Sequence, residues 1–183
     1  VEWEGGFQRI GHLRPFSLPG GAICMREPRR VALSFLHEIF GERLLDLDLQ
    51  PLQSLGSDMT RSLIALLNKE VHCSPTSSIG RLFDGVSSLL GLVQVSGFEG
   101  EAAMALEFLA DRDVNHIRSQ HYHMPLASTS ESQKRWVADW RPLISDIVRD
   151  ICAGKNPAGI AFGFHHTLAK LMTNIAKRMR CAQ

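Results

Sequence analysis

Glycine and proline residues divide this chain into amphipathic helical segments, and this pattern limits it to a largely helical fold. Between the breaks, apolar residues recur at the three- and four-residue spacing of a helix that buries one face. Pro28 can begin such a helix and Gly41 can end it, while the stretch Gly154–Pro157 separates the last two segments. The spacing predicts helices over residues 28–40, 52–68, 78–90, 98–110, 133–152 and 158–180.

The segments between these helices carry other patterns. Residues 5–18 alternate weakly between apolar and polar and are typical of extended chain, and Leu18-Pro19-Gly20-Gly21 indicates a turn. Residues 44–51 are expected to be a linker, and residues 121–127 a short strand or an extended loop. The expected fold is therefore mainly α-helical with a short β element near the N-terminus.

Two of the predicted helices carry signals at their starts. The helix over residues 98–110 is expected to hold Glu99 and Glu101 in its first turn, where carboxylates complement the helix dipole. Ser130 with Gln133 resembles a capping box before the helix that runs to residue 152, and Pro142 can interrupt that helix.

The length and charge of the chain exclude several classes of protein. The 183 residues are enough for one domain with a real core. Lys and Arg number 20 against 19 Asp and Glu, so the net charge of +1 offers no electrostatic case for nucleic acid or a membrane surface. No apolar run reaches the length of a membrane span.

The cysteines and the ends of the chain give two further expectations. The four cysteines, Cys24, Cys73, Cys152 and Cys181, are widely spaced and fit reduced thiols in a cytoplasmic protein. The chain begins at Val1 without methionine and stops directly after a helical pattern. We expect a single partial domain, residues 1–183, from a longer protein.

The segment from Thr76 to Gly91 has more polar and glycine positions than a packing helix needs. Ser77 or Ser78 can cap its first free N–H groups, and Gly91 can end it in a left-handed conformation. Its apolar residues share one face, whereas Gly80 and Asp84 lie on another. One interpretation is structural, with Asp84 paired to Arg81. The other is a ligand-binding floor, with a bare glycine, an acceptor for hydroxyl groups and an arginine for phosphate.

Other polar clusters allow more than one interpretation. His121 and His123 would share one face of a strand, but a metal site needs further ligands, and none is obvious nearby. His165 and His166 point about 100° apart on a helix and cannot easily share a metal. The cluster Arg26-Glu27-Pro28-Arg29-Arg30 is a solvated helix start or an anion contact. No Walker loop or dinucleotide-binding glycine pattern occurs in the chain.

Several ordered blocks of sequence resemble the C-terminal region of the HypF family of hydrogenase-maturation carbamoyltransferases. The specific blocks are Gly80-Arg81-Leu82-Phe83-Asp84 and Phe98-Glu99-Gly100-Glu101-Ala102-Ala103. Leu18-Pro19-Gly20-Gly21, Arg26-Glu27-Pro28 and Phe164-His165 accompany them in the family's order. The chain departs from the family's usual residues at Ala22, Arg29 and His166.

The resemblance implies a fold and a set of site residues. The family's C-terminal region is similar to the actin/hexokinase-type (ASKHA) ATPase lobes of tRNA threonylcarbamoyl transferases, so this chain would be the helical portion of an α/β lobe. Residues that would bind the nucleotide or carbamoyl adenylate are Gly80, Arg81, Asp84, Glu99, Gly100, Arg26 and His165. No catalytic residue and no metal ligand is assigned to this chain, since the divalent metal would be bound by segments outside it.

The resemblance also implies a reaction. The intact protein would convert carbamoyl phosphate and ATP to carbamoyl adenylate and carbamoylate the C-terminal cysteine of a HypE-type partner, a step in [NiFe] hydrogenase maturation. Carbamoyl-adenylate-forming and other domains would lie upstream, and the chain alone would be inactive. Two alternatives are a non-catalytic helical interaction module and a tRNA threonylcarbamoyl transferase relative. Arg81 stands where that second family has Glu.

Overall fold

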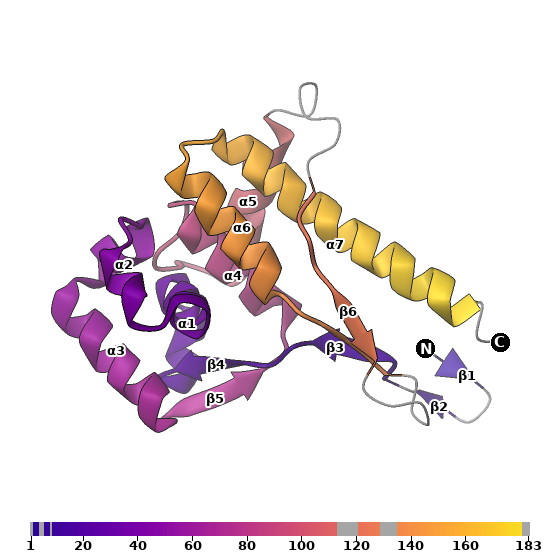
Figure 1. Ribbon diagram of the computed structural model, residues 1–183, viewed down its shortest axis with the longest axis horizontal. Helices are drawn as coiled ribbons and strands as arrows, with labels where there is room; N and C mark the ends of the chain where they lie inside the picture. The colour runs from indigo at the N-terminus through magenta and orange to yellow at the C-terminus, as the bar shows by residue number, and fades with distance from the viewer. Residues whose placement is uncertain (1, 4–5, 8, 113–120, 129–134, 181–183) are drawn as a thin grey trace.

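The computed structural model describes residues 2–3, 6–7, 9–112, 121–128 and 135–180 (Figure 1). Helices form most of it and gather on one side, while short strands extend from under them. The long C-terminal helix crosses over the neighbouring helices and projects beyond them. The α-helices are α1 Pro28–Phe40, α2 Gln50–Leu55, α3 Ser57–Lys69, α4 Ile79–Leu89, α5 Glu101–Asp111, α6 Arg141–Cys152 and α7 Pro157–Arg180. Two 3₁₀ helices are η1 Gly21–Met25 and η2 Gly41–Asp46.

The strands are short and belong to three small sheets. β1 (Glu2–Trp3) pairs antiparallel with β2 (Gly6–Phe7). β4 (Phe16–Pro19) pairs antiparallel with β5 (Cys73–Thr76), which leads directly into α4. β7 (Trp136–Ala138) lies between β3 (Gly11–Leu13), to which it is parallel, and β6 (Leu126–Ser128), to which it is antiparallel.

Helices α4 and α1 pack closely against each other in the core. A Cβ built on Gly85 of α4 would lie 2.2 Å from Cε2 of Phe35 of α1, so the site admits no side chain. Phe35 also packs against Phe16 and Trp140, with ring centroids 4.8 and 4.7 Å away. This aromatic cluster joins β4, α1 and the residue before α6 into one core.

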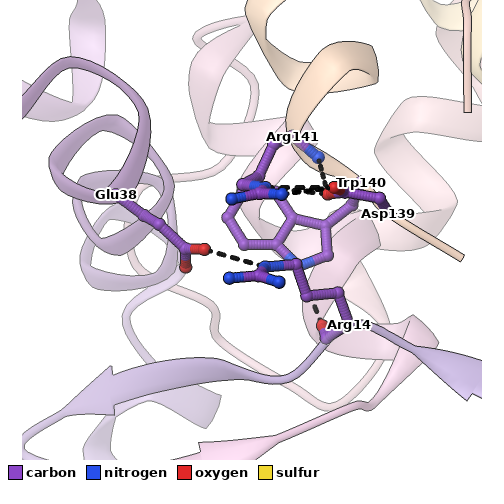
Figure 2. Close-up of polar contacts among 5 residues, drawn as sticks. All are labelled: Arg14, Glu38, Asp139, Trp140 and Arg141. Atoms are coloured by element: carbon purple, nitrogen blue, oxygen red, sulfur yellow. Dashed lines mark hydrogen bonds and ion pairs between the residues drawn. The ribbon is translucent and has the colours of Figure 1, made fainter. Parts of the chain in front are cut away.

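Polar groups enclose the buried Trp140 at the edge of this core (Figure 2). The indole Nε1 donates a 2.8 Å hydrogen bond to the carbonyl of Arg14, and the Arg14 Nε donates a 3.1 Å bond to Glu38 of α1. On the other side, Arg141 donates to both carboxylate oxygens of Asp139. These bonds fasten the chain between β3 and β4 to α1 and to the start of α6.

Most expected helices form close to the expected bounds. α1 and α7 match within a residue, with Pro28 and Pro157 in their first turns, and α4 begins after a Ser78 cap. Gly20 and Gly21 take φ values of 89° and 65° in the expected turn. The mainly helical fold with a short N-terminal β element is therefore confirmed.

Four expectations about helix bounds were wrong, and three of them concern residues 44–68 and the start of α5. The expected linker over residues 44–51 is helical at residues 44–46 and 50–51. The single helix expected over residues 52–68 is divided into α2 and α3 by Gly56, at φ 74° and ψ 165°. Glu99 precedes α5, because Gly100 takes φ 87° as the residue before the helix, whereas Glu101 lies in the first turn as expected.

The sixth helix begins eight residues later than the spacing indicates. Residues 136–138 form β7, in which Trp136 donates its backbone N–H to the carbonyl of Ile10. α6 begins at Arg141 with Pro142 in its first turn, so that proline starts the helix instead of interrupting it. Ser130 and Gln133 lie outside the described residues.

Candidate functional site

Helix α4 is surrounded by other helices, so even its polar face points into the protein. The side-chain oxygen of Ser78 accepts a 3.4 Å bond from the backbone N–H of Arg81, which caps the first turn. Leu82 and Val86 are fully buried on the apolar face, and Asp84 on the other face is only 5% exposed. A carboxylate in such a place is unusual, since burying a charge costs free energy unless it is paired.

A cavity of about 350 Å³ opens beside this carboxylate. It is bounded by the end of η1, by one turn of α4 and by the loop that leads into α5. Its lining residues are Met25, Arg26, Arg81, Asp84, Ser96, Gly97, Phe98, Glu99 and Gly100. Five of the seven residues that the sequence nominates for a nucleotide site therefore share one cavity.

The charges of Asp84 and Arg81 are coupled at the floor of the cavity. Arg81 Nη1 lies 2.6 Å from Asp84 Oδ2 and forms an ion pair with it. The two groups are not aligned for a hydrogen bond, so neither atom has a hydrogen-bond partner. Burial raises the pKa of Asp84 to about 6, and the Arg81 charge opposes that rise. The expected Asp84–Arg81 pair is present, and it is held in a position that water hardly reaches.

Arg26 contributes a second cation to the same cavity. Its side chain is exposed, and within the described ranges it makes no ion pair or side-chain hydrogen bond. Its neighbours are different, because Arg30 donates a 2.6 Å bond to Glu27 and Arg29 donates a 2.9 Å bond to the carbonyl of Ser54. Burial of Glu27 acts to raise its pKa, but these two arginines lower it overall. Of this basic cluster, Arg26 is the member available to an anion in the cavity.

Hydrogen bonds fix the loop that forms the opposite wall. The backbone N–H of Ser96 donates to the carbonyl of Arg26 at 2.8 Å, which ties the loop to the end of η1. The Glu101 carboxylate accepts a 2.6 Å bond from the N–H of Gly97. Gly100, with φ 87°, then turns the chain into α5. The wall is thus held at both ends.

Gly80 and His165 are placed elsewhere. Gly80 lies one turn before Asp84, and a Cβ there would meet only Ser78 Oγ at 3.6 Å, so its outer side is open. His165 of α7 packs its ring 5.4 Å from that of Phe83, and its Nδ1 lies 2.8 Å from the carbonyl of Ala161. Neither residue lines the cavity, and His165 lies at the contact between α7 and α4.

The histidines near residue 122 lie in an extended segment before β6. His121 and His123 line a separate cavity of about 290 Å³ together with Lys170 and Arg178. The segment is held to α7 because the N–H of Tyr122 donates a 2.7 Å bond to Thr167 Oγ1. Across the residues that the structure describes, no group of three or more His, Cys, Asp or Glu side chains could hold a metal ion.

The thiols and the helices add two observations. Cys24, Cys73 and Cys152 are free, and burial raises the pKa of Cys24 to about 12, whereas Cys181 lies outside the described residues. Within the described segments, none of the helices has the length and apolar character needed to cross a membrane.

Sequence reasoning missed four lining residues, Met25, Ser96, Gly97 and Phe98. Phe98 was assigned to a helix, and Met25 and Ser96 carry no local signal. Gly97 and Gly100 were the available clue, because two glycines within four residues indicate a loop rather than a helix.

Comparisons with known proteins agree on one family. A family model described as "Carbamoyltransferase, Kae1-like Domain, second subdomain" matches residues 3–183. The chain is 32% identical over 187 residues to a carbamoyltransferase HypF of Synechocystis, a match that covers 96% of the chain and 23% of that protein. It is also 32% identical over 175 residues to a HypF of Rhodobacter capsulatus, with 95% and 21% covered.

Solved structures give the same result. A crystal structure of full-length HypF in the phosphate- and nucleotide-bound form has a TM-score of 0.81 at 25% identity, covering 97% of this chain and 22% of that one. The crystal structure of T. kodakarensis HypF has a TM-score of 0.76 at 26% identity, covering 94% and 22%. The chain spans less than a quarter of the length of these relatives. It belongs to the HypF carbamoyltransferase family, where it matches the second subdomain of the Kae1-like domain.

Proposed function

We propose that this chain forms the nucleotide-side wall of the carbamoyl-transfer site in a HypF-type carbamoyltransferase. The observation that carries the proposal is the cavity that gathers Arg26, Arg81 and Asp84. A cavity with two guanidinium groups and a buried carboxylate suits a ligand that has both phosphate and hydroxyl groups.

The reaction proposed for the intact protein follows its family. It takes carbamoyl phosphate and ATP to carbamoyl adenylate and transfers the carbamoyl group to the C-terminal cysteine of a HypE-type partner, in the cytoplasm. The name of the relatives supports carbamoyl transfer, and a solved HypF was crystallised with phosphate and a nucleotide. The alternative function, a helical interaction module without chemistry, would leave Arg26 and Asp84 at the cavity without a ligand to bind.

Each cavity residue has a distinct proposed role. Ionised Asp84 accepts hydrogen bonds from the hydroxyl groups of the ribose, and Arg81 favours that ionised form. Arg26 binds phosphate oxygens, because its guanidinium is exposed at the cavity. Glu99 and Gly100 shape the wall that faces them. Outside the cavity, Gly80 leaves the first turn of α4 open, and His165 packs against Phe83 of α4.

The divalent metal of the family is proposed to bind outside this chain. The described residues offer no suitable cluster, and the cavity carries only the two carboxylates of Asp84 and Glu99. The contribution of this chain is therefore positioning and electrostatic stabilisation by groups already in place. The chain alone should show no carbamoyl transfer, and turnover by it would contradict this division of labour.

Nucleotide binding by the intact protein tests the proposal. We expect Asp84→Asn to weaken ATP binding by about tenfold or more, since it removes the charged acceptor at the cavity floor. Isothermal titration of ATP into wild type and variant measures the change. Asp46→Asn is the matched control, because Asp46 is an exposed carboxylate at the end of η2, away from the cavity.

Because the family's upstream carbamoyl-adenylate-forming domain should bind nucleotide too, the titration is expected to show two sites. Only one of them should weaken in the Asp84 variant, and the other serves as an internal reference. An unchanged titration for Asp84→Asn would remove Asp84 from the site and leave the proposal without its main residue.

A further inference from the structure

We infer that the outer face of α7 and the segment before β6 form a docking groove for an extended acidic peptide. Two cavities make up this groove, one of about 290 Å³ between residues 121–126 and α7, and one of about 370 Å³ along the same helix. They are continuous, because Lys170 and Asn174 line both. The groove shares no lining residue with the cavity at Asp84, so it is a second site.

Hydrogen bonds hold the segment before β6 alongside α7 (Figure 1). The N–H of Tyr122 donates a 2.7 Å bond to Thr167 Oγ1, and the Tyr122 hydroxyl donates a 3.2 Å bond to Asp150 of α6. The Tyr122 side chain is buried, whereas His121 and His123 on either side of it are exposed. This wall of the groove is therefore fixed in advance, which lowers the entropy lost when a partner binds.

The groove is rich in cations and poor in carboxylates. The 24 residues of α7 include no Asp or Glu, and within the described residues Lys170, Lys177 and Arg178 make no ion pair with a carboxylate. The nearby Asp150 is already matched by Lys155, whose Nζ lies 2.8 Å from it. The positive charge of the groove is thus left for a partner to neutralise.

The helix dipole accounts for only part of this charge. Cations in the last turn of a helix complement its dipole, and this explains Lys177 and Arg178. It does not explain Lys170, which lies ten residues before the end of α7 and has its Nζ 3.3 Å from Nδ1 of His121. Two basic side chains placed together in a groove provide donors for a carboxylate.

The spacing of the cations favours an extended ligand over a single phosphate group. His166, Lys170 and Lys177 are four and seven residues apart, so they share one face of α7. At about 1.5 Å per residue, the distance along the helix from His166 to Arg178 is about 18 Å. An extended peptide covers that length with about five or six residues, at about 3.3 Å each. One phosphate cannot contact both ends.

The walls of the groove favour a peptide over a nucleic acid. Met124, Leu126 and Leu171 place aliphatic side chains among the cations. Grooves for single-stranded nucleic acid combine cations with aromatic rings on which the bases stack, and the Tyr122 ring is buried here. A peptide that alternates carboxylates with aliphatic residues matches both properties, since every second side chain of an extended chain lies on the same face.

Fluorescence anisotropy with the intact protein tests the inference. The probe is a labelled peptide of sequence Glu-Val-Glu-Val-Glu with blocked ends, and its control is Gln-Val-Gln-Val-Gln. We expect the Gln peptide to bind about tenfold more weakly, or less, because it lacks the side-chain carboxylates. Combining Lys170→Gln with Arg178→Gln should weaken binding of the Glu peptide about three- to twentyfold, since both ion pairs are solvent-exposed.

The matched control combines Arg43→Gln with Lys69→Gln. These two exposed cations lie on η2 and at the end of α3, and neither lines the groove, so the same loss of net charge should leave peptide binding unchanged. Equal weakening by the two double variants, or equal binding of the Glu and Gln peptides, would overturn the inference, because the attraction would then be unspecific.

Two other probes test the choice of occupant. If a hexathymidine oligonucleotide or pyrophosphate binds through Lys170 and Arg178 more tightly than the Glu peptide does, the groove is a nucleic-acid or small-anion site and the inference is wrong. ATP titration should give wild-type binding in the Lys170 and Arg178 double variant. The inference can therefore fail without affecting the proposed nucleotide site, and the nucleotide site can fail without affecting the groove.

Discussion

Two arginine–aspartate pairs in this molecule behave in opposite ways. Around Trp140, Arg141 donates from Nε to Asp139 Oδ1 at 2.9 Å and from its backbone N–H to the same oxygen at 3.1 Å. Those hydrogen bonds lower the pKa of Asp139. At the cavity, Arg81 lies 2.6 Å from Asp84 without an aligned hydrogen bond, and burial raises the pKa of Asp84 to about 6.

The difference distinguishes a structural ion pair, Arg141–Asp139, from the ion pair at the candidate site, Arg81–Asp84. Asp139 has its acceptors filled by one residue and is solvated on its remaining side, so its charge is satisfied within the fold. Asp84 has been removed from water, and its buried Oδ2 has the Arg81 charge beside it but no aligned hydrogen bond, which costs folding free energy. A buried carboxylate of this kind beside a cavity is a candidate for contact with a ligand that supplies the missing donors.

Removing Trp140 should have the largest effect of the changes that test this comparison. Its side chain is fully buried, packs on Phe16 and Phe35, and donates to the carbonyl of Arg14. We expect Trp140→Ala to lower the free energy of unfolding by about 3–5 kcal/mol, the usual range for a deleted core aromatic. Urea denaturation of the chain followed by far-UV circular dichroism measures this loss.

The conservative change Trp140→Phe is the control, since it keeps most of the packing and loses the hydrogen bond. It should cost less than the alanine variant. Equal losses in the two variants would show that the bond to Arg14, and not the aromatic contact, carries the stability of this region.

Much of the helical fold could be predicted because its signals are local. Pro28, Gly41 and Pro157 mark helix ends through their own backbone preferences, and the bounds of α1 and α7 follow from them. β7 was missed because its partner β3 lies more than a hundred residues away in the sequence. Trp136 and Val137 fit a helical stripe and a strand equally well, and only that distant pairing decides between them.

The residues that line the cavity could be predicted in part, for a similar reason. Arg81 and Asp84 are three residues apart on one helix, so their ion pair could be expected from spacing. Phe98 and Met25 reach the same cavity only because a backbone bond joins residues 96 and 26. The depth of Asp84 also depends on the helices packed around α4, which no local pattern shows.

The pH dependence of stability should reveal the cost of burying Asp84. Its folded pKa, about 6, lies above the ordinary 3.8, so the folded state binds the proton more tightly and is favoured at low pH. This contribution is fully present below about pH 4 and is lost as pH rises through about 6. At about 1.4 kcal/mol per pH unit between those values, the change is on the order of 3 kcal/mol.

The measurement is the free energy of unfolding of wild type and Asp84→Asn from pH 4 to pH 7. The difference between them should change across this window and level off above it. Asp46→Asn, at an exposed position, should run parallel to wild type throughout. Parallel curves for Asp84→Asn as well would mean that the carboxylate titrates normally and is not strained by burial.

The smallest expected effect is that of Asp139, whose contribution to stability depends on pH with the opposite sign to that of Asp84. The pKa of Asp139 is lowered, so its stabilisation is present above its ordinary pKa and is lost as pH falls through the lower folded value. Because the Arg141 side chain is 41% exposed, solvent screens the pair, and Asp139→Asn should cost less than about 1 kcal/mol at pH 7. That loss should shrink in 1 M salt, whereas the Asp84 effect should not, since a buried charge is poorly screened. Denaturation of both variants at low and high salt decides the matter, and a salt-sensitive Asp84 effect would show that its carboxylate is solvated after all.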